Sequence, residues 1–182
     1  MSGTTTRGYP YPTFGDVNNF PVQIQALATA IDTDADMLWD RTIAGYNQPA
    51  AVVESVGVNQ SIANQTTVTA TFATEVYDNA NMVNLAVDNG PRIVSTGIYL
   101  AMIRVTFDAT AGAAERQITL TSSAGTVARR TVSATTVTTN FSLSQIFFAS
   151  SGSVITMQQR QNSGGAINTT TRRMAVARIG GI

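Results

Sequence analysis

Four acidic residues stand close enough together in the sequence to suggest a metal site, namely Asp32, Asp34, Asp36 and Asp40. The Asp-x-Asp-x-Asp spacing matches the first half of an EF-hand calcium loop, which needs glycine at its sixth position and glutamate at its twelfth. Those positions hold Met37 and Ile43 here. We therefore interpret the carboxylates as one solvated face of a helix, and we expect no metal site.

Catalytic groups are sparse. The chain has no His and no Cys, which removes imidazole bases, thiol nucleophiles, disulfides and the common zinc sites. The acids after residue 50 are scattered, mostly beside expected turns, at Glu54, Glu75, Asp78, Asp88, Asp108 and Glu115. A carboxylate pair for glycoside cleavage stays open, because two loops can meet in space. No glycine-rich phosphate loop is present, and we expect a non-enzymatic protein without a cofactor.

Charge and hydropathy limit the partners. The 182-residue chain has a formal net charge of zero, and only 12% of its residues are charged. A nucleic-acid-binding domain needs a basic face, so we expect no nucleic-acid partner. No apolar run approaches the roughly 20 residues that cross a bilayer, and no signal peptide is visible. We therefore expect a soluble protein, made in a cytoplasm, without membrane insertion.

All eleven basic residues are arginine, and two pairs are adjacent, Arg129-Arg130 and Arg172-Arg173. We interpret both pairs as solvated charge at sheet edges. Pairing with acids of a docking partner, or with an anionic glycan, stays open as an alternative.

Residues 1–20 are expected to form an extended arm. The run Tyr9-Pro10-Tyr11-Pro12 biases the backbone away from helix, and it has no pattern with which to bury itself. Such an arm either lies along a partner, with Tyr9, Tyr11 and Phe14 as docking anchors, or is a free tail.

Residues 21–40 are expected to form one short helix. Pro21 suits a first turn, and one stripe carries Ile24, Leu27, Ile31 and Leu38. The stripe is compatible with a brief coiled coil between copies or with packing against a domain. Gly45, Asn47 and Pro49 then break the chain, so we place a boundary at residue 48 and expect two parts, 1–48 and 49–182.

The second part is β-rich. We expect about eight short strands separated by Gly, Asn, Asp and Ser turns, a spacing typical of a sandwich or jelly roll. Gln65 to Tyr77 alternates apolar and polar residues and is expected to form one of these strands.

The strand expected within 94–108 is unusual because both of its faces begin apolar. One face carries only core-type residues, Tyr99, Ala101, Ile103, Val105 and Phe107. The other carries Ile98, Leu100 and Met102 before it turns polar at Arg104 and Thr106. In a sheet with one solvent-exposed face, apolar and polar residues alternate along the whole length of each strand. We therefore expect neighbouring copies of the chain to cover Ile98, Leu100 and Met102; cover by a loop or by the N-terminal arm is the alternative.

The order of several pieces resembles C1q/TNF-like jelly-roll domains over about residues 50–182. The pieces are Val-Tyr-Asp-Asn-Ala-Asn-Met at 76–82, Pro-Arg-Ile-Val at 91–94, Thr-Gly-Ile-Tyr-Leu at 96–100, and the segments 148–155, 161–165 and 175–180. The resemblance implies a homotrimer about a threefold axis, with Leu100 and Met102 at the axis. Gly152-Ser153 departs from the Gly-Asp often found at the late turn, so no metal site is carried over.

The N-terminal part resembles the leader of minor tail proteins of bacteriophages that infect actinobacteria. The resemblance lies in residues 8–12, 19–21, 24–28 and 30–32, and it implies attachment to other virion proteins through residues 1–48. We therefore predict a virion structural protein of the tail or baseplate. It would present turn residues to a host surface, including a host glycan, at Asp78, Asn79, Asn81 and Asn162. A capsid decoration protein and a glycan-degrading tail enzyme are the alternatives.

Overall fold

The computed structural model describes residues 3–4, 10–11, 24–35, 48–109, 114–134 and 137–181. The chain divides into two compact units, Met1–Asn47 and Gln48–Ile182. The expected boundary after residue 48 lies one residue from this division. No helix among the described residues is long and apolar enough to cross a membrane.

The first unit contains a small antiparallel pair, β1 (Gly3–Thr4) and β2 (Pro10–Tyr11), and a helix over 24–35. This helix lies inside the expected range of 21–40, and Ile24 and Ile31 of its apolar stripe are both about half exposed. Of the predicted docking anchors, Tyr9 and Phe14 lie outside the described residues, and only the backbone of Tyr11 is described. Docking through this arm stays a prediction.

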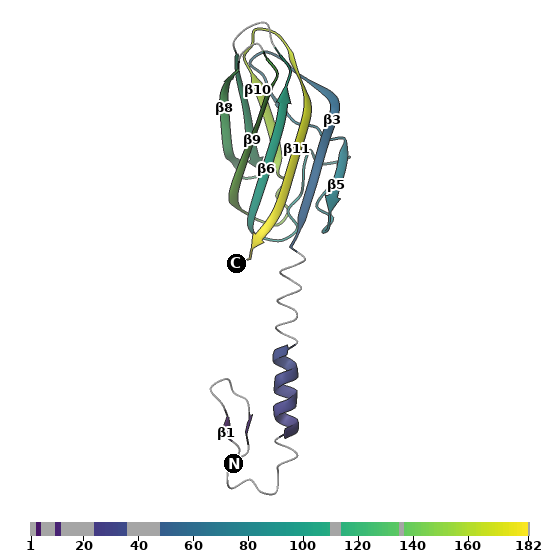
Figure 1. Ribbon diagram of the computed structural model, residues 1–182, viewed down its shortest axis with the longest axis vertical. Coiled ribbons are helices and arrows are strands. Elements are labelled where there is room, and N and C mark those ends of the chain that lie inside the picture. Colours follow the sequence, from purple (N-terminus) through teal and green to yellow (C-terminus); the bar gives the residue numbers. More distant parts are fainter. Residues whose placement is uncertain are drawn as a thin grey trace. The chain divides into compact units, whose positions relative to one another are not determined.

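The second unit is a sandwich of two antiparallel sheets (Figure 1). Its strands are β3 (Ala50–Ile62), β4 (Thr67–Thr69), β5 (Thr74–Asp78), β6 (Gly97–Phe107), β7 (Ala114–Ser122), β8 (Gly125–Ala134), β9 (Thr139–Ala149), β10 (Thr156–Gln161) and β11 (Ile167–Gly180). The five-stranded sheet has the order β5-β3-β11-β6-β9, and the four-stranded sheet has the order β4-β10-β7-β8.

The strand pairing is nested along the chain. β3 pairs with β11, β4 with β10, β6 with β9 and β7 with β8, so the chain behaves as one long hairpin rolled up on itself. This winding, with β5 as an additional edge strand, is that of a jelly roll. The predicted mainly β sandwich is confirmed.

The core lies between the sheets, and β6 supplies its centre. Tyr99, Ala101, Ile103, Val105 and Phe107 are all fully buried, as the alternation predicts. The other sheet and β11 cover them with Ile118, Leu120, Met157, Met174 and Val176. A fully buried side chain of this size stabilises the fold by about 1.5–3 kcal/mol. The core therefore fixes which face of β6 points inward and which points outward.

The prediction of one strand over Gln65 to Tyr77 is wrong. The chain changes sheets there: β4 pairs with β10, and β5 pairs with β3 in the other sheet. Ala70 and Phe72 lie in the crossing segment and still point into the core. The alternation therefore continues through the crossing, and the pattern alone cannot reveal the change of sheet.

The interpretation of Arg172 as solvated charge is also wrong, because its side chain is fully buried. The register of β11 shifts between Thr169 and Thr171, and this bulge places Arg172 on the inward face. Its guanidinium donates hydrogen bonds to the carbonyl oxygens of Thr71 (3.1 Å), Val58 (3.0 Å) and Thr169 (2.7 Å). Burial lowers the pKa of Arg172 below its ordinary value.

Candidate self-association face

The outward side of the five-stranded sheet carries an apolar surface that crosses four strands. Directly opposed residues of an antiparallel pair project on the same side, so the register defines this surface. Leu100 of β6 lies opposite Ile146 of β9 and Ala177 of β11, and Met102 lies opposite Ala175. We call this surface the outer apolar face; it consists of Ile98, Leu100, Met102, Ile146, Phe148, Ala175, Ala177, Ala50 and Val52.

The largest side chains of the outer apolar face are open to solvent. Met102 is 54% exposed, Ile146 56% and Phe148 53%, whereas Ile98 and Leu100 are half-buried by their neighbours. Single exposed apolar residues are ordinary on protein surfaces, whereas a contiguous group of them makes a surface a candidate for interaction. A shallow hollow of about 120 Å³ lies over β3, β11 and β6, with Leu100 and Met102 in its lining. The predicted residues Ile98, Leu100 and Met102 therefore lie together on one such patch.

Sequence reasoning missed Ile146 and Phe148. The signal was available, because β9 is apolar on both faces near its end: Phe147 and Ala149 point inward, while Ile146 and Phe148 point outward. The same two-sided argument that was applied to β6 would have found them. Their register opposite Leu100 and Ile98 places them next to the predicted residues.

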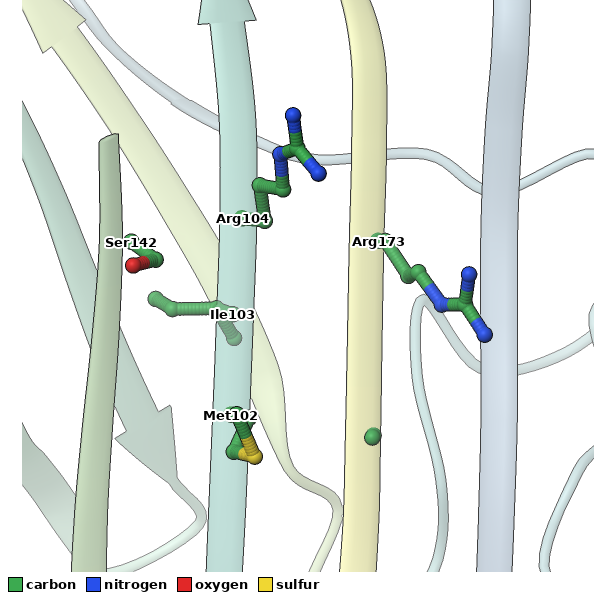
Figure 2. Close-up of a pocket in the computed structure, with 6 residues that line it drawn as sticks. Met102, Ile103, Arg104, Ser142 and Arg173 are labelled. Carbon is green, nitrogen blue, oxygen red and sulfur yellow. The ribbon is translucent and has the colours of Figure 1, made fainter. Parts of the chain in front are cut away.

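A row of charged side chains crosses the same sheet beside Met102. Arg104 of β6 lies opposite Arg173 of β11, which lies opposite Glu54 of β3; we call these three residues the charged row. Nη1 of Arg173 is 3.6 Å from Oε2 of Glu54. Figure 2 shows Arg104 and Arg173 above Met102, with the Arg173 guanidinium directed toward the neighbouring strand. The residues around them line a second hollow of about 360 Å³.

Two of the predicted contact residues, Asp78 and Asn79, organise the turn after β5. Asp78 accepts hydrogen bonds from the backbone N–H groups of Ala80 (3.0 Å) and Val83 (2.9 Å). Partial burial alone would raise the pKa of Asp78, but the surrounding backbone N–H groups outweigh it and hold the pKa below the ordinary value. Asn79 accepts from the backbone N–H of Ala50 (2.8 Å).

The other two predicted contact residues, Asn81 and Asn162, lie apart from each other. Asn81 is exposed and adopts a left-handed backbone conformation, with φ of 54°. Asn162 accepts a hydrogen bond from the backbone N–H of Glu115 at 2.5 Å. Asp78 lies opposite Ala51, at the start of β3. Asn162 lies shortly before β11, whose first residue lies opposite the last residue of β3. The four residues therefore divide between opposite ends of the sandwich, and their contact with a host surface stays a prediction.

Acidic groups do not gather into a metal site in the described part of the chain. Asp88 forms a two-pronged ion pair with Arg92, at 2.8 and 3.0 Å. Glu54 faces Arg173, and Asp78 serves its own turn. Asp108 interacts electrostatically with Arg116, so at least four of the six acids in the second unit have a structural partner.

Comparison with known proteins supports the fold. No protein-family model and no curated protein matches the sequence. Among solved structures, PRD1 vertex protein P5 is 14% identical with a TM-score of 0.51, covering 72% of this chain and 97% of that chain. Murine APRIL at pH 5.0 is 15% identical with a TM-score of 0.49, covering 71% and 99%. The globular domain of zebrafish complement 1qA is 12% identical with a TM-score of 0.47, covering 72% and 96%.

At these identities a likeness concerns the fold alone. The nested strand pairing and the likeness to P5 confirm the predicted mainly β jelly-roll sandwich.

Proposed function

We propose that this chain is a non-enzymatic structural protein of a bacteriophage particle. Its jelly-roll domain forms a homotrimer through the outer apolar face, and residues 1–48 attach it to other virion proteins. Its first proposed place is the tail or baseplate, where a trimer would present loops to the host surface, including a surface glycan. The observation that carries the self-association is the outer apolar face itself, and the virion assignment is supported by the leader resemblance of residues 1–48.

Self-association explains why this face is apolar. Met102, Ile146 and Phe148 each keep about half of their surface exposed in the single chain. Complete burial of such side chains is worth about 1.5–3 kcal/mol each, so covering the exposed half would contribute about 1 kcal/mol per side chain. The neighbouring Ala175 and Ala177 have small side chains, so another sheet or strand can approach the face closely there. Repetition of the trimer on a particle would convert weak surface contacts into avidity.

Two places on the particle are supported by different observations. The leader resemblance of residues 1–48 favours the tail or baseplate. The likeness to a vertex protein, PRD1 P5, favours the second candidate, a capsid protein that decorates or braces the head.

Immunogold electron microscopy of intact particles tests the placement, with the label on this chain. Gold at the tail tip is the expected result. Gold confined to the head would overturn the tail assignment in favour of capsid decoration, and particles without gold would overturn the virion assignment.

A further inference from the structure

The charged row has more positive than negative groups. Arg104 and Arg173 lie directly opposite each other on adjacent strands, an arrangement that is unfavourable for like charges. A single carboxylate, that of Glu54, faces Arg173 at 3.6 Å. A carboxylate has about four acceptor positions, so Glu54 can serve a second guanidinium.

Arg104 is the unbalanced member of the row. It is exposed, and within the described part of the chain it forms no ion pair or hydrogen bond. Its register partner on β9 is Ser142, which is uncharged. Arg104 also lies two residues from Met102 on the same side of the sheet, at the border of the outer apolar face (Figure 2). Covering that face would remove water from the Arg104 guanidinium, which is unfavourable unless a carboxylate is supplied to pair with it.

We propose that Arg104 of one copy forms an ion pair with Glu54 of a neighbouring copy when their outer apolar faces meet. This inference rests on the proposed self-association. Glu54 is the sole acidic residue in β3, β6, β9 and β11, which the structure describes throughout. The row is cationic on the β6 side and anionic on the β3 side. That polarity suits a head-to-tail contact, the kind that closes a ring of subunits.

Disulfide trapping tests the pairing, because the chain has no cysteine of its own. In the double variant Arg104→Cys, Glu54→Cys, β11 separates the two positions within one chain. Their Cα atoms are therefore roughly 10 Å apart, two strand spacings. A disulfide needs Cα atoms within about 7 Å, so any bond between the two positions must join different copies. Mild oxidation should produce reducible covalent oligomers up to a closed trimer on a non-reducing gel, while each single variant stays monomeric there.

Charge exchange gives an independent readout. Arg104→Glu and Glu54→Arg should each weaken association tenfold or more, and the double exchange should restore it to within a few-fold of wild type. Arg129→Glu, an exposed change on the four-stranded sheet, is the matched control and should leave association unchanged. Thermal melts should show that every variant folds.

The outcomes separate the two claims. A wild-type chain that stays monomeric in sedimentation velocity would overturn the proposed self-association. If the wild-type chain is an oligomer, but the double-cysteine variant forms no 104–54 disulfide and the double charge exchange restores no association, the ion pair alone is overturned. Efficient trapping of the Arg104→Cys single variant would also overturn it, because two copies of position 104 would then face each other.

Discussion

Replacing Met102 with arginine tests whether the outer apolar face is an interface. The side chain is 54% exposed in the single chain and lies between Leu100 and Arg104 on the outward side of β6. Its loss should therefore leave the folded subunit nearly as stable as wild type, since little of the core depends on it. Association should suffer instead, because the substitution removes apolar surface and adds a guanidinium to a face that assembly would dehydrate.

The magnitude follows from the exposed half of the side chain. Burying a whole methionine is worth about 1.5–3 kcal/mol, so the exposed half contributes about 1 kcal/mol in each subunit. A trimer would lose about 3 kcal/mol in total, which corresponds to roughly a hundredfold in the association constant. The desolvated charge adds to this loss. We expect Met102→Arg to be monomeric at concentrations where the wild-type chain is a trimer.

Light scattering coupled to size-exclusion chromatography measures the effect, and a urea titration reports subunit stability. Thr131→Arg, an exposed position on the four-stranded sheet, adds the same charge away from the proposed interface and should remain trimeric. A soluble Met102→Arg trimer of wild-type affinity would refute the reasoning. So would an equal loss of association in Thr131→Arg.

Three further predictions concern the fold. Arg172→Met should lower the free energy of unfolding by about 3 kcal/mol in urea titrations, because one buried and two partly buried backbone carbonyls each lose a donor. A loss below about 1 kcal/mol would contradict this. Gly97→Ala should destabilise the fold by about 1–3 kcal/mol, because the new Cβ would lie 2.5 Å from the Gly180 carbonyl oxygen. Gly165→Ala is the control and should be neutral, because a Cβ there would lie in open space. Equal shifts of the melting temperature in the two variants would argue against close packing at Gly97. The pKa of Asp78 lies below the ordinary 3.8, so its ionised form stabilises the fold above that value, and this contribution is lost as pH falls through the lowered pKa. Urea midpoints measured across this acid range should fall less for Asp78→Asn than for wild type, and identical acid profiles would disprove the role.

The sequence predicts β6 and its inward face because an unbroken two-residue period leaves little ambiguity. Tyr99 to Phe107 alternate without Gly or Pro, and the core residues of that strand follow directly from the period. The outward residues Leu100 and Met102 are recognisable by the same argument. What the pattern cannot supply is the set of strands on either side, so the extent of the outer apolar face over β9, β11 and β3 becomes visible only with the register.

The remaining differences between the predicted and the observed structure arise where the alternation of apolar and polar residues is misleading. The crossing between β4 and β5 keeps Ala70 and Phe72 inward, so a change of sheet looks like a continuous strand. The bulge in β11 shifts the two-residue alternation by one residue and places Arg172 on the inward face. Because arginine is charged, the sequence alone does not predict this burial. Asp and Asn are common both in turns and in binding loops, and the sequence cannot separate the turn-forming role of Asp78 from a contact role.

The most direct measurement of the central claim is the mass of the intact wild-type chain in solution by sedimentation equilibrium over a range of concentrations. A chain that covers its outer apolar face with its own copies should converge on three times 19.2 kDa. A mass that stays at 19.2 kDa at every concentration would contradict the account.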